Sequence, residues 1–354
     1  MDINVTCSLS NTGYGIAAKN ILMELDRAGH HISVIPKGNG EADDQEQQYF
    51  LKKWINNGYM FPHNAPHVNI WHQFDLGQTF GRGTKYGFPF FELNRFNDRE
   101  KHNLNYPDHL IVSSKWAAEV VKEQTGRDSY IVPLGVNTEI FSAASQNKDK
   151  PTFKFINAGK WEVRKGHDIL VEIFNRAFNK NDNVELVLIP FNPFLNSQET
   201  IAWERLYKNS PLGDKITIVP HNNYSHRDIA SIMRQCDCGI FPSRAEGWNL
   251  ELLECMACGL PVITTNYSAH TEFCNSFNSY LIDPVSTELA YDGKWFFNQG
   301  DWAKLDDSSI DQFAGIMRHI YQNRPYNIEG VETAQKFTWK ASATALGDLI
   351  NLTK

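Results

Sequence analysis

The sequence predicts an α/β protein of two doubly wound domains, and three observations support this prediction. The chain has 354 residues, 42% of them hydrophobic and 21% charged, which fits roughly two globular domains of ~150 residues. Short apolar segments alternate with segments of helical periodicity along most of the chain, which is typical of parallel sheets. The stretch 142–151 is polar, lies between two such series and is predicted to be a linker.

The first series opens with a strand, a turn, a helix and a second strand. Alternating apolar residues predict a strand at 3–7, and a polar turn containing glycine follows at 8–15. The next residues have a helical apolar face that ends at Gly29, and 31–35 is the next strand. This order is a βαβ unit, which requires a parallel sheet.

The rest of the first series is less regular. The polar residues 37–65 are predicted to form a surface loop or helix. Further strands are expected at 68–71, 110–112 and 130–132, with a helix from Ser113 or Ser114 to about 125.

The second series predicts the second domain. Its strands are expected at 153–157, 184–189, 215–219, 239–241 and 261–264, and its helices near 166–179, 198–208, 226–235, 249–258 and 308–322. Ligands of such domains lie beyond the carboxyl ends of the strands.

Charge, hydropathy and cysteine content exclude several classes of protein. With 34 Lys and Arg against 41 Asp and Glu, the net charge of −7 disfavours broad nucleic-acid binding. No apolar run approaches the ~18 residues of a membrane span, and the first residues lack the basic start of a signal peptide. Cys236-x-Cys238 and Cys255-x-x-Cys258 could suggest zinc, but their apolar surroundings favour core packing, so no metal site is predicted.

The first candidate motif is Gly13-Tyr14-Gly15 and the residues that follow. It matches G-x-G-x-x-G/A between a strand and a helix, which is the pattern of a dinucleotide-binding turn. An acid should then end the second strand and hold a ribose, but Lys37 stands there, which weakens an NAD-dependent oxidoreductase. The turn can serve a diphosphate or a sugar, or it can be a tight turn without a ligand.

The second candidate motif runs from Gly159 to Asp168. Lys160, Arg164 and Lys165 lie between an apolar strand and the start of a helix, where the helix dipole already favours an anion. The alternative is an exposed basic turn.

The third motif spans 243–263 and is the most specific of the three. Glu246 precedes a helix, and Glu254 lies on that helix eight residues later, too far along to serve the helix dipole. Gly259 ends the helix, and Pro261 prevents its continuation.

These motifs together resemble the retaining glycosyltransferases of the GT-B fold, family 4 (glycosyl transferases group 1). Residues 246–263 resemble the E-x7-E signature, 159–166 resemble the phosphate loop, and 133–141 resemble the domain junction. The resemblance covers nearly the whole chain and implies two Rossmann-like domains that face a cleft. It places an acceptor-side domain at 1–145, with a last helix at 338–354 packed back on it, and a nucleotide-sugar donor domain at 151–337.

The resemblance also implies roles for particular residues. Glu246 would contact the donor sugar and His72 the acceptor and sugar, both as catalytic residues, and Glu254 would hold the ribose. The residues implied to bind the rest of the donor, mostly its diphosphate, are Gly13, Gly15, Lys160, Arg164, Lys165, Trp248, Asn249 and Leu250, with Lys165 also counted as catalytic. Two departures are Asn249, where glycine is commonest, and Lys160, where arginine is more frequent. Glu92 resembles an acidic position of some subfamilies and receives no role.

The implied reaction is the transfer of a hexose or pentose from a nucleotide diphosphate-sugar, UDP- or GDP-linked, with retention and without a metal or other cofactor. The acceptor would be a glycan, a lipid-linked sugar or another small molecule. A modified DNA base is an alternative acceptor, disfavoured by the charge, and a non-catalytic binding protein is a further alternative. The expected location is the cytoplasm, either free or peripheral to a membrane.

Overall fold

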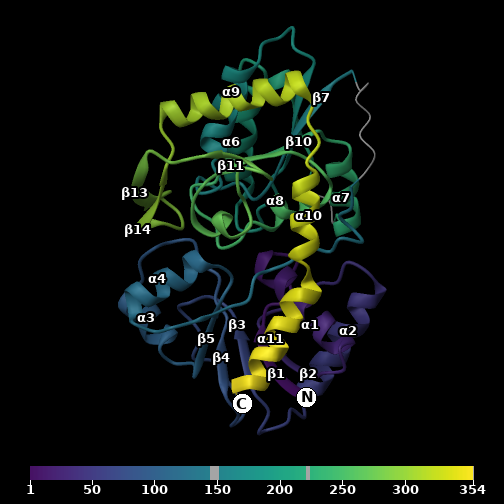
Figure 1. Ribbon diagram of the computed structural model, residues 1–354, viewed down its shortest axis with the longest axis vertical. Helices are drawn as coiled ribbons and strands as arrows, with labels where there is room; N and C mark the ends of the chain where they lie inside the picture. The colour runs from purple at the N-terminus through teal and green to yellow at the C-terminus, as the bar shows by residue number, and fades with distance from the viewer. Residues whose placement is uncertain (144–150, 221–223, 354) are drawn as a thin grey trace. The chain divides into compact units, whose positions relative to one another are not determined.

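The computed structural model describes residues 1–143, 151–220 and 224–353, which form two compact units (Figure 1). Unit 1 comprises residues 1–136 and 336–354, and unit 2 comprises 137–335. Of the linker expected at 142–151, residues 144–150 lie outside the described residues. The chain therefore leaves unit 1 at Val136 and returns to it at Lys336.

Unit 1 is built on a parallel six-stranded sheet. In sheet order its strands are β2 (His31–Pro36), β1 (Asp2–Cys7), β3 (His67–Ile70), β4 (Lys85–Gly87), β5 (His109–Val112) and β6 (Tyr130–Ile131). The strand order reverses direction between β1 and β3, and this is the topological switch point at which ligands of doubly wound sheets bind.

Unit 2 repeats the plan with a second parallel sheet of six strands. In sheet order these are β12 (Tyr280–Ile282), β11 (Val262–Thr265), β10 (Cys238–Phe241), β7 (Phe153–Ala158), β8 (Val184–Ile189) and β9 (Ile216–Ile218). Its switch point lies between β7 and β10. The two sheets confirm the predicted α/β fold of two doubly wound domains.

Helices cover the sheets of both units. Those of unit 1 are α1 (Gly13–Arg27), α2 (Gln45–Gly58), α3 (Asp98–Leu104), α4 (Lys115–Thr125) and α11 (Trp339–Thr353). The C-terminal α11 lies beside α1, as Figure 1 also shows. The region expected as a loop or helix at 37–65 therefore contains a helix, α2, whose N-cap Asp44 accepts a hydrogen bond from the backbone of Gln47.

Unit 2 has its own helices and core. The helices are α5 (His167–Ala177), α6 (Ser197–Lys208), α7 (His226–Arg234), α8 (Leu250–Ala257), α9 (Asp307–Asn323) and α10 (Ile328–Lys336), with two short 3-10 turns at Gly213–Lys215 and Ser268–Glu272. The long α9 packs on α5, and together with the sheet they enclose a core that includes Phe155, Phe174 and Phe313.

Several elements were not predicted from the sequence. The short strand β4 and the helix α3 fall in a polar region of unit 1, and an antiparallel hairpin of β13 (Ser286–Tyr291) and β14 (Phe297–Lys304) joins β12 to α9. Helix α1 begins at Gly13, inside the expected turn, because Thr12 takes the extended conformation of an N-cap.

In the described residues, the cysteines form no disulfide and no helix is suited to span a membrane. The six cysteines are buried and carry free thiols, as expected for core packing. No helix in the described part of the chain combines the length and hydropathy needed to cross a membrane.

Candidate functional site

The second and third sequence motifs meet at the switch point of unit 2. The loop 159–166 follows β7, and the loop 242–249 follows β10, which pairs with β7 in the sheet. At Gly166 the backbone is left-handed, with φ of +75°, and an added Cβ would lie 2.1 Å from the carbonyl oxygen of Pro242. Glycine at this position therefore allows the two loops to pack directly against each other.

Arg164 is buried between the two loops. Its guanidinium donates to Glu162 Oε2 at 2.8 Å, to Glu246 Oε2 at 2.7 Å and to the carbonyl oxygen of Ala245 at 2.8 Å. The resemblance gave Arg164 to the donor diphosphate, whereas in the structure its guanidinium holds the carboxylate of Glu246 in place. A planar guanidinium is suited to bridging two carboxylates in this way.

Lys165 approaches the same carboxylate from the other side. Its ammonium lies 3.1 Å from Glu246 Oε1 and 3.7 Å from Glu251 Oε2, and the side chain is nearly buried. Burial lowers the pKa of Lys165, but the attraction of Glu246 and Glu251 outweighs it, so the net pKa is raised. Lys165 is therefore a charged group that is held at the entrance to α8.

Glu246 is ionised for the complementary reason. Burial would raise its pKa, but Arg164 and Lys165 outweigh burial and hold the pKa well below the usual range. The hydroxyl of Ser243 also donates to Glu246 Oε1 at 2.9 Å, and the Glu246 amide donates to Ser268 Oγ at 2.8 Å. The carboxylate is thus fixed by Arg164, Lys165 and Ser243, and the Glu246 backbone by Ser268, before any ligand binds.

Lys160 lies at the more exposed end of this arrangement. Its ammonium is 2.9 Å from Glu162 Oε1, so Lys160, Glu162, Arg164, Glu246 and Lys165 form a row of alternating charge. Among the candidate cations, Lys160 and Lys165 carry compact ammonium groups, which suit a diphosphate as point charges.

Helix α8 begins beside this row. Its N-cap Asn249 has φ of 79° and ψ of 77°, a left-handed conformation that glycine adopts readily and that fits the glycine expected here from the resemblance. The Asn249 side chain accepts from the amide of Leu252 at 3.3 Å and donates to His270 Nε2 at 2.9 Å. Trp248 is buried against Phe273, with ring centroids 4.9 Å apart. Trp248, Asn249 and Leu250 therefore stand together at a helix N-terminus, where an anion is favoured.

Glu254 lies one turn further along α8 than Glu251. It is buried, and burial raises its pKa to about 8, helped by Glu251 and opposed by His226. Its carboxyl group is therefore mostly protonated at neutral pH and can donate as well as accept a hydrogen bond.

The candidates in unit 1 gather at its own switch point. Gly13 and Gly15 are in the first turn of α1, and the ring of Tyr14 between them lies 4.5 Å from that of His72, which follows β3. A Cβ at Gly15 would meet the backbone oxygen of Ser10 at 2.1 Å, so close approach, and not an unusual φ, requires glycine there. Burial raises the pKa of Tyr14, and the negative charge of Glu92 also raises it.

Some supporting residues were missed by the sequence analysis. Arg244 forms a two-pronged ion pair with Asp168, both contacts at 2.8 Å, which ties the loop after β10 to α5. His270 holds Asn249, and its Nδ1 lies 2.9 Å from the carbonyl oxygen of Thr265. No motif marks these residues, because their partners are separated by up to 76 positions in the sequence.

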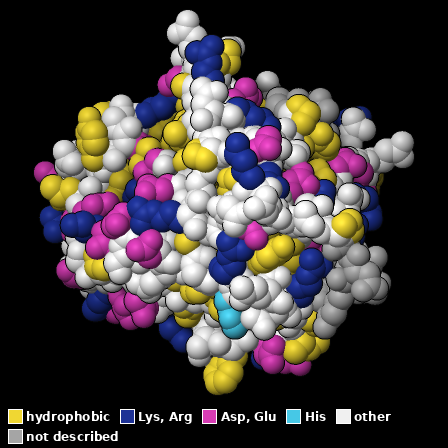
Figure 2. All heavy atoms as spheres, turned by 90° about the horizontal axis from the view of Figure 1, so that it is seen from above, with side chains coloured by type: hydrophobic (Ala, Val, Ile, Leu, Met, Phe, Trp, Pro, Cys, Tyr) yellow, Lys and Arg dark blue, Asp and Glu magenta, His cyan; other side chains and the backbone are white. Residues whose placement is uncertain are grey.

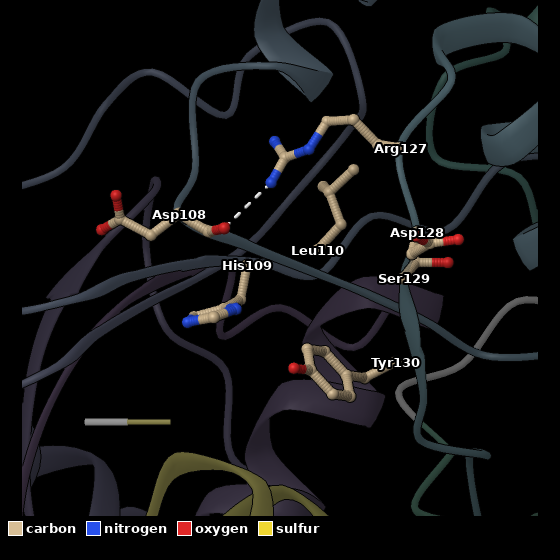
Figure 3. Close-up of a pocket in the computed structure, with 7 residues that line it drawn as sticks. All are labelled: Asp108, His109, Leu110, Arg127, Asp128, Ser129 and Tyr130. Carbon is tan, nitrogen blue, oxygen red and sulfur yellow. Dashed lines mark hydrogen bonds between the residues drawn. The ribbon is translucent and has the colours of Figure 1, made fainter. Parts of the chain in front are cut away.

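A separate pocket lies in unit 1, at the amino ends of the strands β5 and β6. It has a volume of about 280 Å³, and it is lined by Asp108, His109, Leu110, Arg127, Asp128, Ser129 and Tyr130 (Figure 3). These residues surround the amino ends of β5 and β6, away from the switch point, and Arg127 donates to the Asp108 carbonyl oxygen at 2.9 Å.

Within the described residues, no group of three or more His, Cys, Asp or Glu side chains is placed to hold a metal ion.

Comparison with known proteins finds a family match that covers the candidate site of unit 2. Residues 138–298 match the family Glycosyl transferases group 1. The chain is 24% identical over 281 residues to the putative glycosyltransferase 45 of Sulfolobus islandicus filamentous virus (isolate Iceland/Hveragerdi), covering 77% of this chain and 71% of that protein. Several other curated relatives are longer, and the chain spans 17% of one and 58% of another.

Solved structures show the same fold over the whole chain. The sucrose-phosphate synthase of Thermosynechococcus elongatus superposes with a TM-score of 0.74 at 17% identity, covering 99% of this chain and 98% of that one. Anabaena Alr3699/HepE in complex with UDP gives a TM-score of 0.72 at 13% identity, covering 99% of both chains. The chain thus has the GT-B fold of glycosyltransferases. The segment 138–298, which contains the candidate site of unit 2, is similar to the glycosyl transferases group 1.

Proposed function

We propose that this protein transfers a sugar from a nucleoside diphosphate-sugar to an acceptor, with retention of anomeric configuration and without a metal ion. The observation that carries the proposal is the row of alternating charge that ends at Lys165, beside the N-terminus of α8 and at the switch point of unit 2. A helix N-terminus with adjacent lysines is suited to a diphosphate.

The donor would lie on unit 2. Lys165 and Lys160 bind its diphosphate, together with backbone amides of Trp248, Asn249 and Leu250. Glu246 holds the hydroxyls of the sugar, and Glu254 holds the ribose. Arg164 is a positioning residue in this arrangement, because its donors already serve Glu162 and Glu246.

Unit 1 would supply the acceptor side. His72 lies at the switch point of its sheet, the usual ligand position in such a fold. Gly13 and Gly15, beside His72, keep their proposed part in binding the donor. A glycan, a lipid-linked sugar or another small hydroxyl compound is the proposed acceptor class. Association with a membrane surface remains a prediction.

In the reaction the bond between the anomeric carbon and the diphosphate oxygen breaks, and its electron pair stays on the diphosphate. The acceptor hydroxyl oxygen forms the new bond to the anomeric carbon, and its proton passes to the leaving diphosphate oxygen. Negative charge therefore grows on the leaving group, where Lys165, Lys160 and the α8 N-terminus can stabilise it. In the proposal these fixed positive groups take the place that a divalent cation has in other transferases.

Two alternatives are disfavoured. An NAD-dependent oxidoreductase needs an acid after β2, but Lys37 stands there and pairs with Asp75 at 2.8 Å. A DNA-base acceptor would require a basic surface, and on the face seen in Figure 2 basic and acidic side chains are interspersed.

The test is a thermal-shift screen with UDP-, GDP-, ADP- and dTDP-sugars. A bound donor raises the apparent stability by RT ln(1 + [L]/Kd), so the correct base and sugar give the largest rise in Tm. The best donor is then incubated with candidate acceptors, and the anomeric configuration of the product is read by NMR. Absence of a shift with every donor, or an inverted product, contradicts the proposal.

A further inference from the structure

Two half-exposed aromatic rings lie beside the loop 159–166 and have no place in the proposed donor site. Phe194, in the loop after β8, is 55% exposed, and Trp295, at the tip of the β13–β14 hairpin, is 47% exposed. Their ring centroids are 5.9 Å apart, with the rings nearly perpendicular. The ammonium groups of Lys160 and Lys294 lie 5.4 Å from the centroids of Phe194 and Trp295 respectively. These four residues are called the aromatic ledge.

The hairpin tip that carries Trp295 is fixed by hydrogen bonds. Asp292 Oδ1 accepts from the amides of Lys294, Trp295 and Phe296 at 2.7–2.8 Å. The Lys294 ammonium in turn contacts Glu199 Oε1 on α6 at 2.5 Å. Trp295 is therefore presented on a preorganised turn, which lowers the entropy cost of binding a ligand.

The other half of the aromatic ledge is tied to the loop 159–166. The buried Asn192 donates through Nδ2 to the carbonyl oxygen of Trp161 at 3.0 Å and accepts from the amide of Phe194 through Oδ1, also at 3.0 Å. Lys160 belongs both to this loop and to the aromatic ledge. A ligand on the ledge is thus adjacent to the proposed diphosphate site.

The charge of the aromatic ledge is balanced. Glu162 contacts both Lys160 and Arg164, and Glu199 pairs with Lys294, so each lysine of the aromatic ledge has a carboxylate beside it. A carboxylate beside each lysine disfavours an anionic membrane surface as the occupant. Two half-exposed rings flanked by polar groups fit a neutral ligand with an apolar face and a rim of hydroxyls, which is the chemistry of a sugar ring.

The row of charges sets the direction of the site. It runs from Lys160 through Glu162, Arg164 and Glu246 to Lys165. Lys165 lies 3.7 Å from Glu251, and Glu254 follows Glu251 by one turn of α8. If Glu254 holds the ribose, the aromatic ledge lies at the end away from the nucleoside. Its occupant is then on the carbohydrate side of the reaction.

We propose that the aromatic ledge is a binding site for the sugar chain of a neutral oligosaccharide acceptor, with Phe194 and Trp295 stacking on its rings. This inference rests on the proposed function for the direction of the site. It assigns the acceptor to the class of oligosaccharides and gives unit 2 a part in acceptor recognition.

The experiment uses the full chain and a Phe194→Ala/Trp295→Ala double variant. Phe277→Ala, at an 84% exposed phenylalanine of unit 2, is the matched control. Binding is measured on an array of neutral oligosaccharides of glucose, mannose, galactose and N-acetylglucosamine, and the Kd of UDP and of GDP is measured by calorimetry. We expect the double variant to lose at least about tenfold in oligosaccharide affinity. The Kd of the nucleotides and the behaviour of the control should not change.

Each other outcome overturns the inference. Wild-type protein that binds no oligosaccharide, or a double variant that keeps full affinity, removes the site. Weakened UDP or GDP binding would show that the rings stack on the base. Loss of binding to phosphatidylcholine–phosphatidylglycerol vesicles would show a membrane contact. Trp295→Tyr, which keeps a ring, should retain most affinity, so general damage to the hairpin can be recognised. Failure of wild type to bind any nucleotide contradicts the proposed function separately.

Discussion

Lys165 is the side chain on which the proposed transfer depends most. It is charged, nearly buried and directed at the start of α8, with Glu246 3.1 Å away. Because its position is fixed before the donor binds, little reorganisation is needed when charge develops on the diphosphate.

Lys165→Ala should lower kcat/KM by roughly 10- to 100-fold or more. A charge-assisted contact is worth about 1.5–3 kcal/mol, and more where charge grows in the transition state. Steady-state kinetics with the donor found by thermal shift measure the loss. Lys180→Ala, at an exposed lysine of unit 2, is the control. Full activity of Lys165→Ala would remove the phosphate-loop assignment.

Glu254 should make the fold less stable as the pH rises. Its pKa is raised from 4.5 to about 8 by burial, so the folded state holds a proton that the unfolded state has lost between these values. The stabilising contribution is complete below pH 4.5 and declines up to about pH 8. The upper bound is about 4–5 kcal/mol, since one pKa unit corresponds to about 1.4 kcal/mol.

Glu254→Gln removes this titration while keeping the shape of the side chain. The Tm of the variant relative to wild type should therefore increase between pH 5 and pH 8, as measured by calorimetry. Glu332→Gln, at an exposed glutamate, should show no such trend. A constant difference across this pH range would mean that Glu254 is ionised in the folded protein.

Among the elements, the first turn of α1 is set by a close backbone approach. Gly15→Val would place a Cβ 2.1 Å from the Ser10 oxygen, so the loop before α1 must move. We expect reduced transfer with nearly unchanged UDP or GDP affinity, because the proposed nucleotide contacts are in unit 2. Gly13→Ala, where a Cβ meets nothing within 4 Å, should leave the Tm unchanged. Loss of nucleotide binding in folded Gly15→Val would instead place the nucleotide on unit 1.

The elements that sequence patterns predicted are those with internal signals. Helix α8 has an apolar face and ends before Gly259, so the sequence predicted its position, with Glu246 before it and Glu254 on it. The contact of Arg164 with Glu246 could not be predicted in this way. The two residues come from different loops and are 82 positions apart in the sequence. The β13–β14 hairpin was missed because its mixed polar strands lack the continuous apolar runs of a buried parallel strand.

For the whole molecule, we expect activity to survive chelation. In the proposal the charges that stabilise the leaving diphosphate are side chains of the protein, and EDTA cannot remove them. The initial rate with the best donor should change by less than about twofold on adding EDTA. Loss of activity that manganese restores would overturn the metal-independent mechanism.

The whole molecule also divides its candidate groups between two similar units. Each unit has one switch point. The lysines and glutamates proposed to hold the donor lie at the switch point of unit 2, and His72, proposed to contact the acceptor, lies at that of unit 1. Ligands of parallel sheets bind at switch points in general, so the fold class could be predicted before any role was assigned to a residue.

The row of alternating charge has a consequence for which anions can enter. Glu246 and Glu251 act as internal counter-ions of Lys165, so an incoming anion must share the ammonium with carboxylates that are already in place. Free inorganic phosphate offers nothing to offset that competition. A nucleoside diphosphate does, because its ribose and base add contacts of their own. In the proposed function, these carboxylates would therefore favour a nucleoside diphosphate over small anions such as inorganic phosphate.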